Sequence, residues 1–175
     1  VKAFCIEDCP SLEFALETAL LDLLSGGTKK IYDTNFYNAQ EHIPINGLVW
    51  MNTKEHMLEQ VKSKIEEGYS CIKMKIGAIN FDEELEVLKY IRANYSDKRL
   101  VLRVDANGAF NYDQAKKVLR ELELLQIHSV EQPIKVNCPC EMRSLSKYNS
   151  VGVALDEELI GVTELNDKIQ LLEDV

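Results

Sequence analysis

Charged side chains stand at the ends of four segments that otherwise have the composition of buried strands. Lys73 and Lys75 alternate with apolar residues in CIKMKIG, and Asp105 follows RLVLRV. Glu131 ends the segment IHSVE, and Asp156 ends VGVALD. Three carboxylates on neighbouring strands would repel one another, and a bound divalent cation would relieve this repulsion. A ligand set made only of oxygen atoms favours Mg2+ or Mn2+ over zinc.

Two lysines next to such an ion would have lowered pKa values, because nearby positive charge disfavours the ammonium form. A neutral lysine amine is a usable general base near neutral pH. With a substrate carboxylate on the ion, the lysine would remove the proton from the adjacent carbon, and the ion would stabilise the resulting enediolate. The residues together therefore predict metal-assisted proton abstraction next to a carboxylate.

Each of these residues has a simpler explanation when it is taken alone. The two lysines could protect an exposed edge strand from aggregation. Asp105 comes just before the turn signal Asn107-Gly108 and could be only a turn residue. Asp156 could belong to a charge run at the start of a helix. The order of the charges, with lysines first and acids on three successive strands, favours a common site.

Strand and helix patterns alternate at least five times along the chain, which is the signature of a parallel sheet. The expected strands are 43–51, 71–77, 99–108, 127–134 and 151–158. The expected helices are 10–27, 52–70, 80–95, 112–126, 140–149 and 163–175, with Ser11 as the cap of the first. The sequence contains no glycine-rich phosphate loop.

Residue parity separates the two architectures that such a sheet allows, an open doubly wound sheet and a (β/α)8 barrel. Along the third expected strand, Val101, Arg103 and Asp105 share one face, and the opposite face is apolar throughout. An open sheet covered by helices on both sides should be apolar on both faces. The pattern therefore favours an α/β fold of the TIM-barrel type, with the charged residues at the carboxyl ends of its strands. Trp50, near the end of the first expected strand, could line the mouth of the barrel, but we expect it in the core.

The composition argues against several classes of partner. The 175 residues carry a net charge of −9, which disfavours binding to nucleic acid or to anionic membranes. No apolar run is long enough to cross a bilayer, and the N-terminus lacks a signal-peptide pattern. The five cysteines form no paired framework, so we expect a reducing, cytoplasmic location. The oligomeric state stays open.

The motifs KMK, RVDANGAF, EQP and ALDEE resemble those of the enolase superfamily, and specifically of its muconate-lactonizing-enzyme subgroup. Sites of this superfamily use a lysine or histidine base together with Mg2+. The resemblance implies that Lys75 is the general base and that Lys73 assists it. The implied ligands of Mg2+, for which Mn2+ could substitute, are Asp105, Glu131 and Asp156. Weaker candidates, for contacts that support these ligands, are Asn107 and Arg103.

The resemblance also implies how much of the fold this chain supplies. A barrel of this type needs roughly 250 residues. We expect residues 44–175 to form its first five βα units, and residues 1–43 to be the tail of an N-terminal capping domain with its junction. The other barrel units, a lysine that the family carries on the sixth strand and most of the capping domain are expected outside this chain, which would then be a fragment.

Within the subgroup, the chain is most similar to enzymes that dehydrate a cyclohexadiene carboxylate to an aromatic product. The expected function is therefore that of a lyase acting on a small-molecule carboxylate. Dipeptide epimerases, N-acylamino acid racemases and muconate cycloisomerases would share the same site residues and remain alternatives. A non-catalytic metal-binding α/β domain is the alternative from another class, and the two intact lysines argue against it.

Overall fold

The computed structural model describes residues 9–173 and 175, which divide into a unit that ends at Pro44 and a unit that begins at Ile45. In the first unit, helix α1 covers Pro10–Leu24, and none of its residues is buried. The helix begins at Pro10 with Cys9 as its N-cap, so the expectation that Ser11 caps it is wrong. Proline favours the first helical position because its fixed φ suits the helix and its missing N–H is not needed there.

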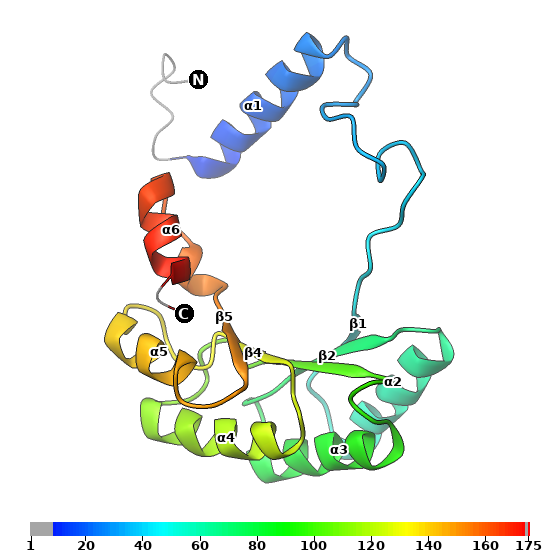
Figure 1. Ribbon diagram of the computed structural model, residues 1–175, viewed down its shortest axis with the longest axis vertical. Coiled ribbons are helices and arrows are strands. Elements are labelled where there is room, and N and C mark those ends of the chain that lie inside the picture. Colours follow the sequence, from blue (N-terminus) through cyan, green and yellow to red (C-terminus); the bar gives the residue numbers. More distant parts are fainter. Residues whose placement is uncertain (1–8, 174) are drawn as a thin grey trace. The chain divides into compact units, whose positions relative to one another are not determined.

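The second unit contains a five-stranded parallel sheet in the order β1-β2-β3-β4-β5 (Figure 1). Its strands are β1 (Gly47–Val49), β2 (Cys71–Lys75), β3 (Val101–Asp105), β4 (Ser129–Glu131) and β5 (Gly152–Ala154). Its helices are α2 (Lys54–Glu66), α3 (Phe81–Asn94), α4 (Tyr112–Leu124), α5 (Pro139–Ser146) and α6 (Leu165–Glu173), with the short 3-10 helix η2 (Glu157–Leu159) after β5. Strands that pair in sequence order are consecutive barrel units, whereas an open doubly wound sheet reverses its order. The predicted α/β fold is therefore confirmed.

The two faces of this sheet have different surroundings. Helices α2, α3 and α4 lie along one face, as Figure 1 shows. Ile72 and Met74 of β2 are fully buried in the core on that side. Lys73 and Lys75 alternate with them and therefore point to the opposite face. The apolar side chains of β2 thus face the core, and its two lysines face the opposite side of the sheet.

Side-chain caps fix the points at which the chain turns from a strand into the next helix. Thr53, Asn80 and Asn111 accept backbone N–H groups at the starts of α2, α3 and α4, respectively. In α4 the cap is reciprocal, because Gln114 also bonds the backbone of Asn111. These caps hold the loops at the carboxyl ends of the strands. Among the described residues, no helix has the length and apolar character that crossing a membrane requires.

Candidate active site

The carboxyl ends of β2, β3 and β4 bring charged side chains into register. Lys75 is paired with Asp105, and Asp105 with Glu131, across two parallel ladders. One layer below, Lys73 is paired with Arg103. The alternation of strand side chains places all five on the face opposite the helices.

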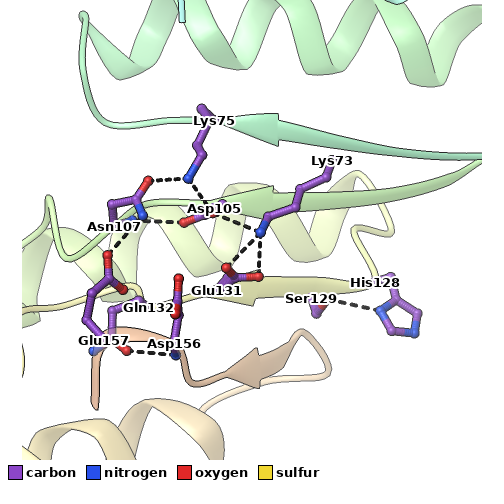
Figure 2. Close-up of polar contacts among 10 residues, drawn as sticks. All are labelled: Lys73, Lys75, Asp105, Asn107, His128, Ser129, Glu131, Gln132, Asp156 and Glu157. Carbon is purple, nitrogen blue, oxygen red and sulfur yellow. Dashed lines mark hydrogen bonds and ion pairs between the residues drawn. The ribbon is translucent and has the colours of Figure 1, made fainter. Parts of the chain in front are cut away.

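Four of these charges form one network of alternating sign (Figure 2). Lys73 Nζ lies 2.7 Å from both carboxylate oxygens of Glu131 and 2.9 Å from Oδ2 of Asp105. Lys75 Nζ donates to Oδ2 of Asp105 at 2.7 Å and to Oδ1 of Asn107 at 2.7 Å. Asp105 is only 1% exposed, so its charge depends on the two ammonium groups for compensation.

The shared ammonium of Lys73 separates the pKa values of the two carboxyls. Burial acts to raise the pKa of Asp105, but the hydrogen bonds from Lys75 and Lys73 outweigh burial and lower that pKa below its ordinary value. Burial raises the pKa of Glu131, and the Asp105 carboxylate adds to this effect against the opposing influence of Lys73. Two carboxylates that share one cation do not ionise equally easily. Asp105 is therefore the more strongly ionised of the pair.

The pKa of Lys73 moves in the direction opposite to the one expected for a lysine beside a cation. Burial acts to lower this pKa, but the hydrogen bonds to Glu131 and Asp105 raise it by more than burial lowers it. The net shift of the pKa is upward. The cause is that carboxylates face the amine on two sides. As a stable ammonium, Lys73 is suited to hold negative charge rather than to accept a proton.

Asp156 lies apart from this network. Strand β5 ends at Ala154, so Asp156 follows two residues beyond the strand, where it is exposed. Its backbone N–H donates to Oε1 of Gln132 at 3.2 Å. In the part of the chain that the structure describes, no three His, Cys, Asp or Glu side chains are grouped closely enough to hold a metal ion. The assignment of Asp105, Glu131 and Asp156 as ligands therefore stays a prediction.

Asn107 connects the Lys75 amine to the loop after β5. Its φ of +44° lies in the left-handed region, which asparagine tolerates better than most residues. Its N–H donates to Oδ1 of Asp105 at 3.1 Å, and its Nδ2 donates to Oε1 of Glu157 at 2.9 Å. The other Glu157 oxygen, Oε2, is buried without a hydrogen-bond partner among the described residues. This edge of the sheet thus has a buried acceptor oxygen that no described residue bonds, and such an oxygen suits the binding of a hard cation.

Two expectations about neighbouring residues need correction. Arg103 is exposed and makes no hydrogen bond or ion pair with the described residues, although Lys73, its partner in the register, contacts both carboxylates. Trp50 is 57% exposed rather than part of the core, and its ring centroid lies 5.9 Å from Lys75 Nζ. The Gln60 side chain holds the Trp50 backbone through both its N–H, at 2.9 Å, and its carbonyl, at 3.1 Å.

Gln132 is a structural part of the site that our sequence reasoning missed. It is 1% exposed, and its Oε1 accepts the N–H groups of Asp156 at 3.2 Å and Glu158 at 3.3 Å. Its Nε2 donates to the carbonyl of Ile134 at 3.1 Å. Gln132 therefore ties the end of β4 to the loop that carries Asp156. The motif EQP contained the signal, but only the structure assigns the glutamine a role.

We expect Gln132→Leu to destabilise the protein by about 1–3 kcal/mol, because it leaves the N–H groups of residues 156 and 158 without their acceptor. Urea unfolding of the parent and the variant measures this loss. Gln40→Leu, at an exposed position, is the control and should change the stability little. Equal stability of the parent and Gln132→Leu would show that water replaces the amide without cost.

Glu84 is the second residue that the sequence reasoning missed. It is fully buried on α3 and accepts the backbone N–H groups of Gly77, Ala78 and Ile79. Burial raises the pKa of Glu84, and the three N–H groups oppose this effect only in part. The carboxyl thus holds its proton more tightly in the folded chain than in the unfolded one.

The raised pKa of Glu84 predicts a dependence of stability on pH. Stability that comes from such a group is present below its usual pKa of 4.5 and is lost as the pH rises through the folded value. Glu84→Gln removes this titration. As the pH rises from 4.5 to about 7, we expect the parent to lose free energy of unfolding that the variant does not lose. The difference in stability between the two proteins should therefore change in the variant's favour over this range. Urea unfolding at both pH values tests this, and a constant difference would contradict it.

This fold and this site define the class of protein. The family described as "Enolase C-terminal domain-like" matches residues 56–171, and the chain belongs to this family. The o-succinylbenzoate synthase of Desulfotalea psychrophila is 48% identical over 153 residues, which are 87% of this chain and 42% of that protein.

Solved structures agree with this relationship. The crystal structure of MenC from Desulfotalea psychrophila LSv54 has a TM-score of 0.83 at 43% identity, covering 94% of this chain and 45% of that one. The o-succinylbenzoate synthase from Thermosynechococcus elongatus BP-1, complexed with Mg in its active site, has a TM-score of 0.60 at 28% identity, covering 67% and 37%. The chain therefore spans less than half the length of these proteins.

Proposed function

We propose that this chain carries the base and the metal ligands of an o-succinylbenzoate synthase, a Mg2+-dependent carbon–oxygen lyase of menaquinone biosynthesis. The reaction converts 2-succinyl-6-hydroxy-2,4-cyclohexadiene-1-carboxylate to 2-succinylbenzoate with loss of water. The observation that carries the proposal is the Lys75 amine, held by Asp105 and Asn107 at the strand ends. The 48% identity to an o-succinylbenzoate synthase supports the choice of substrate within the family.

The two lysines have different roles in this proposal. Lys75 removes the proton from the carbon next to the substrate carboxylate. Its contacts to Asp105 and Asn107, both 2.7 Å long, restrict the position of the amine. Lys73 remains an ammonium and places positive charge where negative charge develops on the substrate. The C–O bond then breaks, and the leaving hydroxide takes up the proton that Lys75 removed, so that water is lost. Formation of the aromatic ring supplies much of the driving force.

We propose Asp105, Glu131 and Asp156 as the ligands of Mg2+, with Mn2+ as a substitute. The solved synthase that holds Mg in its active site supports the choice of metal. The donor set of this chain fits, because these three side chains offer only hard oxygens. Oε2 of Glu157, in the loop that carries Asp156, is a further buried oxygen without a partner among the described residues. When bound, the ion supplies positive charge that stabilises the negative charge left on the substrate after proton removal.

Removal of the metal is expected to abolish the activity. Excess EDTA should reduce turnover of the protein at its natural length to the background rate, and added Mg2+ or Mn2+ should restore it, because the developing charge loses its compensation. Steady-state assays with the chelator and with metal add-back measure this. Full activity in EDTA would contradict the metal-dependent mechanism.

The proposed function is tested by following the diene absorbance of the substrate as it is dehydrated. Mg2+-dependent loss of this absorbance by the protein at its natural length supports the synthase. Turnover of dipeptides or N-acylamino acids in its place would assign the chain to an epimerase or racemase. Mg2+ binding without turnover of any of these substrates would favour a non-catalytic domain.

The domain organisation and the location are further parts of the proposal. Residues 44–175 would supply the first five βα units of the barrel, and residues 1–43 the tail of the capping domain. The division of the chain between Pro44 and Ile45 supports this boundary. A cytoplasmic location is supported by the four described cysteines, which are all free.

A further inference from the structure

The loop between β2 and α3 is held by a buried carboxylate for which the proposed reaction has no use. Oε2 of Glu84 accepts the N–H of Gly77 at 2.7 Å, and Oε1 accepts those of Ala78 at 3.3 Å and Ile79 at 3.4 Å. A carboxylate with 0% exposure is costly unless hydrogen bonds replace its water. The three N–H groups that donate to it all belong to the backbone of one loop, which begins two residues after Lys75.

The same loop packs against the loop that follows β3. Gly77 has a φ of +86°, and a Cβ at this position would lie 2.5 Å from Cβ of Ala109 and 3.3 Å from Phe110. The loop of Ala109 also carries Asn107, which accepts the hydrogen bond of the Lys75 amine. The Glu84 carboxylate therefore holds the first loop while the second loop contacts it at Gly77.

The backbone next to the amine is part of the same assembly. The N–H of Ile76 donates to the carbonyl of Asp105 at 2.8 Å, so strand pairing continues up to the residue before Gly77. Lys75 stands directly before this point, and its two acceptors, Asp105 and Asn107, belong to β3 and its loop. A shift of residues 77–79 would move the end of β2 relative to β3.

We propose that Glu84 is a positioning residue for Lys75, because it holds residues 77–79 against Ala109 and so fixes the Lys75 amine relative to Asp105 and Asn107. The consequence for the rate rests on the proposed function, in which Lys75 is the base. Glu84 acts through the backbone and does not touch the substrate. A displacement of about 1 Å in a reacting group can cost on the order of 100-fold in rate.

The first test compares Glu84→Gln with Glu83→Gln in the protein at its natural length. Both variants remove one charge from the first turn of α3, but Glu83 is exposed. Glutamine keeps the shape of Glu84 but offers one acceptor oxygen instead of two, so at least one loop N–H loses its partner. We expect kcat of Glu84→Gln to fall about 10-fold or more with KM and Mg2+ affinity within about threefold of the parent. Glu83→Gln should match the parent.

Two further measurements on the same variants do not depend on the substrate. Hydrogen exchange of a peptide that covers residues 76–80 should be faster in Glu84→Gln than in Glu83→Gln. Trace acetylation should label Lys75 several-fold faster, relative to the exposed Lys98, because the amine is held less firmly. If the parent does not turn over the diene, the proposed function fails, and these two measurements still decide whether Glu84 positions Lys75.

A second pair of variants covers the case in which Glu84→Gln does not fold. Gly77→Ala and Gly68→Ala introduce the same backbone strain, at φ values of +86° and +93°, but a Cβ at Gly68 meets nothing within 4 Å. We expect only Gly77→Ala to reproduce the lower kcat and the faster labelling of Lys75. Faster exchange of residues 76–80 with unchanged kcat and unchanged Lys75 labelling would overturn the proposal and leave Glu84 a purely structural role.

Discussion

Replacement of Lys75 by alanine is expected to lower kcat about 1,000-fold or more, because the reaction loses its general base. Binding of Mg2+ should change little in this variant. Asp105 keeps its contact with Lys73 at 2.9 Å and with the N–H of Asn107 at 3.1 Å after the Lys75 amine is removed. Loss of turnover with retained metal binding would therefore separate the base from the metal site.

Two comparison variants make this prediction specific. Lys75→Arg retains the positive charge beside Asp105 but cannot act as a base near neutral pH, so we expect it to be as inactive as the alanine variant. Lys98→Ala, at an exposed position, should be fully active. Diene loss measures turnover, and isothermal titration measures Mg2+ affinity. More than a few per cent of the parent activity in Lys75→Ala would remove Lys75 from the role of base.

The arrangement of the charged network could be predicted from the sequence because it depends on local geometry. Side chains along a strand alternate between two faces, so Lys73 and Lys75 had to share a face, as did Asp105 and Arg103. Parallel strands bring their carboxyl ends to one edge, which placed Glu131 beside Asp105. Neither step requires knowledge of a distant contact.

The limits of the strands could not be predicted in the same way. The sequence pattern suggested a first strand over 43–51, but only Gly47–Val49 pairs with β2, and Ile43 and Ile45 are exposed. The composition of a segment indicates how hydrophobic it is and whether it suits a strand. The residue at which the strand ends depends instead on where the neighbouring strand stops pairing with it. The same uncertainty left Asp156 two residues beyond the end of β5.

The buried polar contacts are the part of the site that pattern reasoning cannot reach. The acceptor Oε1 of Gln132 bonds backbone groups 24 and 26 residues away. The partners of Glu84 are N–H groups, which every residue except proline carries and which leave no signature in the sequence. A glutamate in the first turn of a helix is ordinarily explained by the helix dipole, and only its complete burial shows that it does more.

Asp105→Asn is expected to weaken Mg2+ binding about 100-fold, because it removes a negative charge from the least exposed position of the network. The asparagine also leaves Lys73 and Lys75 beside a neutral amide, so their mutual repulsion increases and disfavours a cation further.

Titration of the protein at its natural length with Mg2+ measures the affinity, and Asp97→Asn, at an exposed position, is the matched control. Lowered affinity with a native far-ultraviolet spectrum is the expected result. Unchanged affinity would remove Asp105 from the ligand set, and the buried carboxylate would then serve only to hold the two lysines.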